Sequence, residues 1–330
     1  MRTRGGMIDL RTIIAQRTRQ LASLRDPDDA TALLALLRLL YETGRQDLPL
    51  GRLFEGHVDA LQIVSRYGDS GQVLAAAAAA SAGAAFGVWN ADLRDEPLTL
   101  DQSCLTGGKS FASGAGILSH ALVSVDVKGG RQLILVDLGK ARPAIDRNFW
   151  SVIGMQRSAT HIVRWDGARI DAADVIGTPG DYVREPWFSG GALRFAAVQA
   201  GGIAALVDRT RDHLVTAGRA DDPHQAGRLA ALFAAAEAAA GAIRAAAATW
   251  YTDEDARLPM VSAARAAVYE AGGLALTLAQ EAVGVQALFV DHPLSATITD
   301  LSMYLRQPGP DAQRMCVGAA VASGLIRPSL

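Results

Sequence analysis

The stretch ALVSVDVKGGRQLILVDL at residues 121–138 decides the fold class. Its two halves, 121–127 and 132–138, are rich in aliphatic and β-branched residues and are bounded by Gly, Asp and Lys. This pattern predicts two strands. Further short strands are predicted at 85–89, 110–112 and 161–165. Together they form a β-rich region that runs from about residue 86 to residue 176.

Helical patterns lie on both sides of this region. Before it, helices are predicted at 7–24, at 28–43, from an N-cap at Asp47 to Tyr67, and in the Ala-rich run 71–85. After Pro186, long helices are predicted at 187–217, 222–251, 255–286 and about 293–306. Short turns between long helices are typical of an up-and-down bundle. The proline-rich segment 307–310 should end the last of these helices.

The order of elements predicts an α+β fold in three parts. An N-terminal helical domain spans 1–85, a middle β-domain of barrel or sandwich type spans 86–180, and a C-terminal four-helix bundle spans 181–330. The small side chains of 71–85 should let this helix lie closely against a flat surface.

Composition excludes several classes of function. The 330 residues carry a net charge of −2, which gives no electrostatic reason to expect nucleic acid or an anionic membrane as a partner. Cys104 and Cys316 have no metal-site spacing, so reduced thiols and no metal are expected. The first ten residues do not read as a signal peptide, and the apolar run 73–88 is short for a membrane span. We expect a cytoplasmic protein.

Several motifs could carry chemistry. The segment GGKSFASGAG at 107–116 combines glycines with hydroxyls, which suits close approach of a ligand, although a hairpin with a Gly-rich bend would have the same composition. Its spacing differs from that of the phosphate-binding loop. The others are FGVWN at 86–90, GMQRSAT at 154–160, PWFSGGALRF at 186–195 and AQEAVG at 279–284.

The order and spacing of these motifs resemble the acyl-CoA dehydrogenase family of flavoproteins, from about Leu48 to Arg314. That family has the same three parts. Its GxKxxI[TS] strand resembles Gly107–Ser113, its GMRxT strand pair resembles Gly154–Ile170, and its QxxGG segment resembles Gln280–Gly284.

The resemblance implies FAD as cofactor, bound between the middle domain and the bundle. It implies that Ser113 lies beside the flavin ring and that Phe111 stands where the family usually has Trp. Trp89 and Asn90 match the strand that contacts the ring, through backbone groups. The family holds the adenosine end with a neighbouring subunit, which implies roles for four further residues. These are Arg219, Gln225, Gln280 and Gly284.

The family removes a substrate proton with a desolvated Glu. Both positions where members place this Glu are vacant here. One is Leu193, before Arg194, and the other lies in the segment 305–311, which has no Glu. Asp311 and Glu185 are the nearest carboxylates, and we take Asp311 first and Glu185 second as candidate bases. The N-terminal domain is also shorter than in a typical member.

Three hypotheses remain open. The first is an FAD-dependent dehydrogenase that acts on an acyl thioester of CoA or a carrier protein and passes electrons to an acceptor. The second is a subunit that has lost catalysis and completes the FAD site of a hetero-oligomer. The third is a flavin-dependent monooxygenase, which needs no such Glu but should place a His or Ser over the flavin. The candidate histidines are His57, His120 and His161. In each case we expect an oligomer built through the bundle.

Overall fold

The computed structural model describes residues 9–307 and 309–328. The chain forms two compact units, each discontinuous in sequence. The first unit, termed the β-unit here, comprises Met1–Asp26, Leu53–Ser151 and Arg157–Arg184. The second, termed the helical unit, comprises Pro27–Arg52, Val152–Gln156 and Glu185–Leu330. These elements confirm the predicted α+β class.

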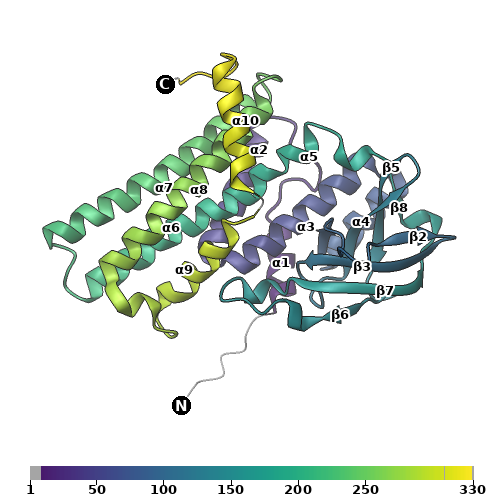
Figure 1. Ribbon diagram of the computed structural model, residues 1–330, viewed down its shortest axis with the longest axis horizontal. Coiled ribbons are helices and arrows are strands. Elements are labelled where there is room, and N and C mark those ends of the chain that lie inside the picture. The colour runs from purple at the N-terminus through teal and green to yellow at the C-terminus, as the bar shows by residue number, and fades with distance from the viewer. Residues whose placement is uncertain (1–8, 308, 329–330) are drawn as a thin grey trace. The chain divides into compact units, whose positions relative to one another are not determined.

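Two four-stranded sheets form the centre of the β-unit (Figure 1). One has the order β1-β4-β5-β8 and the other the order β2-β3-β7-β6; among these strand pairs of the described residues, β1–β4 is parallel and the others are antiparallel. The strands are β1 (Phe86–Trp89), β2 (Thr99–Asp101), β3 (Cys104–Ala112), β4 (His120–Val127), β5 (Gly130–Asp137), β6 (Ala144–Asp146), β7 (His161–Arg169) and β8 (Val175–Ile176). The predicted strands correspond to β1, β3, β4, β5 and β7, whereas β2, β6 and β8 were not predicted.

Strand β3 is six residues longer at its start than the predicted 110–112. Gly107 and Gly108 suggested a turn, but both lie inside the strand, paired with Trp165 and Arg164 of β7. Gly107 has φ +98°, and a Cβ there would lie 2.3 Å from the Pro97 carbonyl oxygen. The glycines therefore allow the segment 92–97 to lie directly against the strand.

Helices α3 (Leu48–Tyr67) and α4 (Ser70–Ser81) cover one sheet of the β-unit. Ala76 and Ala80 of α4 are buried in one cluster with Phe86, Leu122 and Leu133 of the sheet. The Ala-rich helix thus packs closely on a flat surface, as predicted. Helix α1 (Leu10–Thr18) belongs to the same unit, and α3 begins in the helical unit.

The helical unit contains long helices, of which α7 and α8 lie side by side (Figure 1). Its helices are α2 (Ala30–Gln46), α5 (Trp187–Gly190), α6 (Ala192–Thr216), α7 (Pro223–Thr249), α8 (Arg257–Val283), α9 (Pro293–Tyr304) and α10 (Pro310–Ala322), with a 3-10 turn η5 (Gly284–Leu288). The four predicted bundle helices correspond to α5 with α6, α7, α8 and α9. Helix α2 packs on α6 within this unit, so residues 27–52 group with the bundle. The predicted three-part division by secondary structure stays a prediction.

Two glycines bring α2 and α6 into backbone contact. A Cβ at Gly201 of α6 would lie 2.0 Å from the Tyr41 carbonyl oxygen, and a Cβ at Gly44 of α2 would lie 2.2 Å from the Val198 carbonyl oxygen. No real Cβ tolerates such distances. Any residue larger than glycine at either position would therefore force α2 and α6 apart.

Helix α10 was not predicted. Helix α9 ends at Tyr304, as expected from the proline-rich segment that follows it. Pro310, however, occupies the first turn of a new helix. A proline both prevents a helix from continuing and favours the first position of the next one, because that position needs no backbone N–H donor.

Candidate functional site

An irregular end of β3 presents Phe111 on the surface of the β-unit. The pairing of β3 with β7 shifts between Lys109 and Ala112, and Phe111 adopts φ +51°. Such a shift re-aims a side chain, and a non-glycine residue at positive φ is held there by its surroundings. The ring is 51% exposed, and its edge contacts Phe149 at 5.1 Å and Trp150 at 6.5 Å between centroids. An aromatic surface therefore lies two residues from Ser113.

Three buried hydroxyls form a chain at the same strand end. Thr160 Oγ1 donates to Ser113 Oγ at 2.9 Å, and the hydroxyls of Ser158 and Thr160 are 2.8 Å apart. The backbone of the segment is tied down as well, because Gly114 N donates to Ser158 O at 2.8 Å. Ser113 is 6% exposed. Ser113 thus occupies a fixed, polar position near the exposed Phe111 ring.

Trp89 and Asn90 are held close to this segment by side-chain contacts. The Trp89 indole Nε1 donates to Ser113 O at 2.9 Å. Asn90 Oδ1 accepts from Ser124 Oγ at 2.7 Å and from Arg131 Nη1 at 3.0 Å. The resemblance implied backbone roles for Trp89 and Asn90. That role stays a prediction, and the side chains of both residues join β1 to β3, β4 and β5.

A buried charge network supports the residues after β1. Lys109, which is fully buried, donates to Asp92 Oδ1 at 2.5 Å and to Asn90 O at 3.2 Å. Arg131 pairs with Asp92 at 2.6 Å and with Asp126 at 2.8 Å. Burial lowers the pKa of Lys109, and the bond to Asp92 opposes this effect. The lysine of the GxK motif therefore clamps the segment that follows Trp89.

The three candidate histidines have different environments. His57 is fully buried between Thr18 Oγ1 and Phe86 N, and burial lowers its pKa to about 4. His120 stacks on Phe86 at 4.7 Å. His161, which pairs with Ala112, has a buried Nδ1 that no described residue hydrogen bonds. His57 and His120 are packing residues, and His161 is the one that pairs with the Phe111–Ser113 strand end.

Four predicted cofactor residues gather at one end of the helical unit. Arg219 follows α6 and is exposed, and Gln225 lies in the first turn of α7. Gln280 and Gly284 end α8, and the Arg228–Glu281 ion pair (3.6 Å) places this end beside the start of α7. Gln225 is 4% exposed, and its Oε1 has no hydrogen-bond partner among the described residues. A buried amide oxygen without a partner among the described residues indicates a position for a ligand or a second chain.

The two candidate bases are not desolvated. Asp311 lies in the first turn of α10, where its side chain is 86% exposed and pairs with Arg314 at 3.0 Å. Glu185 is exposed and caps α5, accepting from the backbone N–H (3.0 Å) and the hydroxyl of Ser189. Leu193 is 2% exposed. In the helical unit itself, neither carboxylate has the water-excluded environment of a general base.

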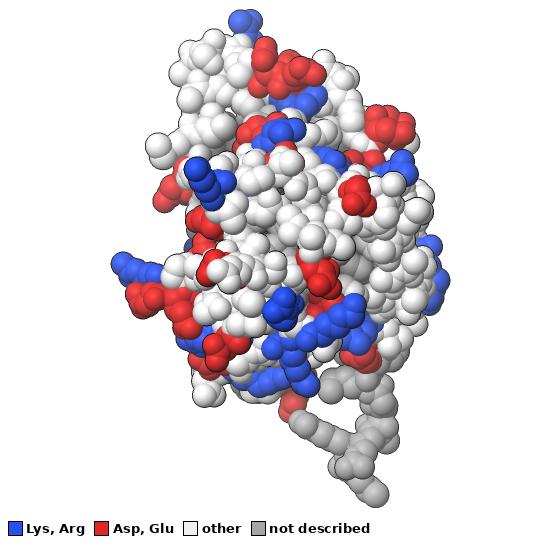
Figure 2. Space-filling model, turned by 90° about the vertical axis from the view of Figure 1, so that its right-hand side faces the viewer, with Lys and Arg blue, Asp and Glu red and all other residues white. Residues whose placement is uncertain are grey.

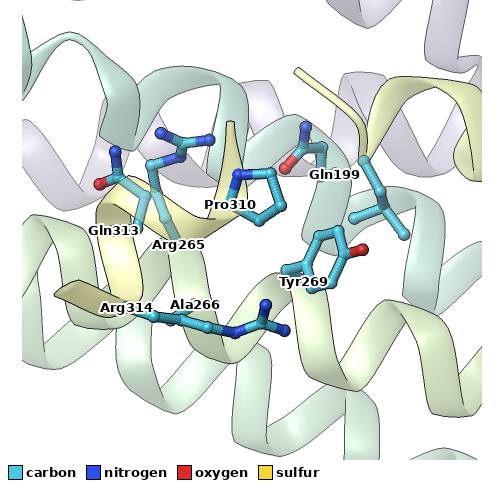
Figure 3. A pocket seen from close by; sticks show the side chains of 8 residues that line it. Gln199, Arg265, Ala266, Tyr269, Pro310, Gln313 and Arg314 are labelled. Carbon is cyan, nitrogen blue, oxygen red and sulfur yellow. The ribbon is translucent and has the colours of Figure 1, made fainter. Parts of the chain in front are cut away.

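A small pocket opens between α6, α8 and α10 (Figure 3). Arg265 is 7% exposed, donates to Gln307 O at 3.2 Å and lies 4.6 Å from the Phe195 ring centre. Burial lowers its pKa to about 10. Arg306 and Arg314 both lie over the Tyr269 ring. The lining residues are Gln199, Arg265, Ala266, Tyr269, Leu305, Pro310, Gln313 and Arg314.

Sequence reasoning missed the Ser158–Thr160 hydroxyls as partners of Ser113, although both lie in the GMQRSAT motif. It also missed Phe149 and Trp150, for which an adjacent aromatic pair was the available signal. The contact between His213 Nδ1 and His292 Nε2, at 3.2 Å, joins α6 to the start of α9 and has no local signal. Among the described residues, no group of three His, Cys, Asp or Glu side chains could hold a metal ion.

Charges of both signs are interspersed on the face that Figure 2 shows. Two described helical segments are long and apolar enough to cross a membrane. They are Trp187–Thr216 and Pro223–Thr249, whose most apolar windows are 72% and 33% buried, and a bent pair, Arg257–Leu288 with Pro293–Tyr304, would make a third. The core of a helical bundle also requires such composition.

No protein-family model matches the sequence, and no curated protein matches it either. Solved structures do match. The dibenzothiophene monooxygenase TdsC from Paenibacillus sp. A11-2, in complex with FMN and indole, is 16% identical, with a TM-score of 0.78 over 96% of this chain and 94% of that chain.

Two further structures have the same architecture. Butyryl-CoA dehydrogenase from Megasphaera elsdenii is 13% identical, with a TM-score of 0.78 over 95% of this chain and 89% of that chain. KijD3, in complex with FMN and a dTDP-linked sugar, is 20% identical, with a TM-score of 0.74 over 97% of this chain and 86% of that chain. The chain therefore has an acyl-CoA dehydrogenase-like fold.

Proposed function

We propose that this protein is a flavin-dependent oxidoreductase. Three features of its own residues fit a flavin: the aromatic surface at Phe111, the Ser113 hydroxyl beside it, and the buried Gln225 amide oxygen, which has no partner in the described part of the chain. TdsC and KijD3 hold FMN in their structures, which supports the same class of cofactor here. When bound, a flavin supplies the electron transfer, and the protein supplies binding and orientation.

In this proposal Phe111 packs against the flavin ring system and Ser113 hydrogen bonds it, with Trp89 holding the Ser113 main chain. Gln225, Arg219, Gln280 and Gly284 hold the adenosine end when the cofactor is FAD. Gln280 donates one N–H to Leu276 O at 2.9 Å, so its amide oxygen and its second N–H are the groups that it can offer.

For the reaction, we favour monooxygenation by reduced flavin and O₂. The observation that carries this choice is the environment of Asp311 and Glu185. Dehydrogenation of an acyl thioester needs a desolvated base, whereas Asp311 is 86% exposed and ion-paired, and Glu185 is a helix cap. Monooxygenation requires no such base, and TdsC is a monooxygenase on this fold. A separate reductase or reductant would supply the electrons.

Dehydrogenation of an acyl thioester is the second candidate. One observation favours it: Asp311 directly follows Pro310, which lines the pocket of the helical unit. In that case the electrons pass from the substrate through the flavin to an acceptor. A subunit without catalysis, which completes the flavin site of a related chain, is the third.

Visible spectroscopy tests the cofactor, and anaerobic reduction separates the reactions. The purified protein, mixed with FMN or FAD and then gel-filtered, should retain the absorption bands of flavin and melt at a higher temperature. In the favoured case, flavin reduced by dithionite is reoxidised by O₂ with oxygenation of a substrate, and acyl thioesters leave oxidised flavin unbleached. Bleaching by an acyl thioester would establish the second candidate. A protein that retains flavin but catalyses neither reaction would support the third candidate, the subunit without catalysis.

We also propose that a second copy of this chain covers α7 and α8. Phe233 of α7 and Leu274 of α8 are 62% and 51% exposed, and the turn after α8 exposes Val285, Phe289 and Val290. An apolar surface of this kind indicates an interface, and a twofold dimer is the usual closed assembly. Light scattering at micromolar concentration should report an oligomer that Phe233→Lys weakens. Leu74→Lys, at a 71% exposed site of the β-unit, should leave it intact. A monomeric wild type would contradict the proposal.

A further inference from the structure

The side chains of His213 and His292 join the end of α6 to the start of α9 by a hydrogen bond whose direction is fixed. His292 is the N-cap of α9, and its Nδ1 accepts from Leu294 N at 3.2 Å. A backbone N–H can only donate, so this Nδ1 carries no proton, and the neutral ring has its proton on Nε2. His292 Nε2 therefore donates to His213 Nδ1 at 3.2 Å, and His213 Nδ1 carries no proton either.

Protonation of either ring disrupts this arrangement. A proton on His292 Nδ1 would face the Leu294 N–H, so α9 would lose its side-chain cap and gain a positive charge at its N-terminus, where the helix dipole disfavours it. A proton on His213 Nδ1 would face the His292 N–H instead. Both rings are half-buried, so water can reach them. The bond between the rings thus requires that both are neutral.

The surroundings of the pair also oppose protonation. Burial lowers the pKa of His213, and the charges of His292 and Arg219 lower it further. No carboxylate of the described residues offsets these effects at His213. Other charged groups on the neighbouring elements are Arg209, which interacts with Asp47, Asp208 and Asp300, Asp291, which precedes His292, and Glu281, which pairs with Arg228.

The pair lies at one end of the contact between α6 and α9. Further along, Gly202 of α6 lies against Leu301 of α9, since a Cβ at Gly202 would be 3.2 Å from Leu301 Cδ1. The turn that leads into α9, residues 284–292, is held by local bonds such as His292 N to Phe289 O at 2.9 Å. The bond from His292 to His213 ties the end of this turn to α6.

We propose that the His213–His292 bond is a pH-sensitive switch, which holds the turn 284–292 and the start of α9 against α6 when both rings are neutral and releases them when either ring is protonated. Histidine in water titrates near pH 6.5, so the bond is formed at about pH 7.5 and is lost below about pH 6. A ring that takes up its proton only on release makes release about tenfold more favourable at pH 5.5 than at pH 7.5. The switch is independent of a bound flavin.

Hydrogen–deuterium exchange of the full chain without flavin tests this inference. Exchange rates are divided by the intrinsic rate at each pH, which leaves the protection that the structure provides. Protection of residues 284–297 in wild type should fall about tenfold or more from pH 7.5 to pH 5.5. His213→Gln keeps an acceptor for His292 but removes one titrating ring, so the fall should be smaller.

The double variant His213→Gln, His292→Asn should have the same protection at both pH values, because asparagine caps a helix without titrating. His224→Gln is the matched control. It removes an exposed histidine at the start of α7 and should keep the wild-type fall. Residues 264–275 of α8 serve as the internal reference and should stay protected.

A wild type whose protection does not change with pH, or a double variant with the wild-type fall, would overturn the inference. So would an equal fall in residues 264–275, because that would indicate general unfolding. Melting curves at pH 7.5 show whether the double variant folds. If it does not, His213→Gln is compared with His224→Gln, and equal falls in these two variants would overturn the inference.

Discussion

The indole nitrogen of Trp89 donates a 2.9 Å hydrogen bond to the main-chain carbonyl of Ser113. The bond joins the end of β1 to the end of β3, two segments that the flavin proposal assigns to the same ligand. Both groups are buried, so the bond has no competition from water. The position of Ser113 depends on a side chain 24 residues away in the sequence.

Trp89→Phe should weaken flavin binding as well as the fold. The substitution leaves the Ser113 carbonyl without its donor, which should lower the free energy of unfolding by about 1–3 kcal/mol. Trp165→Phe is a matched control, because Trp165 Nε1 donates to Ala141 O at the same 2.9 Å in the same unit. Urea titrations should show similar losses for both variants, and flavin titrations a weaker affinity only for Trp89→Phe. Equal flavin affinities would show that Trp89 has no part in the site.

The stability of the β-unit should fall in mild acid because of His57. Burial lowers its pKa to about 4 in the folded state, below the ordinary value of 6.5, so the unfolded chain binds the proton more tightly. The contribution of neutral His57 to the free energy of unfolding is fully present above pH 6.5 and is lost as the pH falls toward 4. It amounts to about 3 kcal/mol.

Urea unfolding at several pH values checks this expectation. His57→Gln keeps a polar group of similar reach but does not titrate, so its stability should depend less steeply on pH between 6.5 and 4. Parallel pH profiles for wild type and variant would show that His57 contributes nothing to acid unfolding.

Asp311→Asn and Glu185→Gln should leave oxygen-dependent turnover within about threefold of wild type. Both carboxylates make local contacts to Arg314 and Ser189, and surface changes of this kind usually alter stability by less than about 0.5 kcal/mol. Initial rates with reduced flavin and O₂ measure the effect. A loss of about 10² or more in Asp311→Asn would instead identify a positioned base and favour dehydrogenation.

Alanine at two helical glycines should have opposite effects. Gly201→Ala places a Cβ 2.0 Å from the Tyr41 carbonyl oxygen, so α2 and α6 must separate, at a cost of about 1–3 kcal/mol or more. Gly227→Ala in α7 meets nothing within 4 Å and should stabilise the helix by about 0.5–1 kcal/mol. Thermal melts of the two variants should therefore shift in opposite directions. Two shifts of the same sign would contradict the close backbone contact of α2 with α6.

Local sequence signals predicted the elements that depend on local chemistry. Asp47 was predicted as an N-cap, and its Oδ1 accepts from Leu50 N at 2.8 Å. The Ala-rich helix was predicted to lie on a flat surface, and it does. Helix α10 was missed because Pro310 has two meanings, the end of one helix and the start of the next, and only the first was considered.

The sequence motifs predicted the residues of the candidate site but not the contacts that these residues make. Ser113 and Phe111 were identified from the spacing of one segment, whereas the partners that orient them, Thr160 and Phe149, lie 47 and 38 positions further along the chain. The exposure of Phe111 also depends on a shift in strand register, which no single segment encodes. Long-range hydrogen bonds and register follow from how strands pair, so they become visible only in the folded chain.

The contact between α2 and α6 restricts which substitutions homologues of this chain can accept. Alanine is abundant in its helices, and Ala-rich surfaces resemble one another, so they give little information about which helix pairs with which. Gly44 and Gly201 supply that information, because the crossing excludes even one methyl group at either position. The lack of a side chain at these two positions thus specifies which helix packs on which. A homologue with larger residues at both positions must pack its helices in a different way.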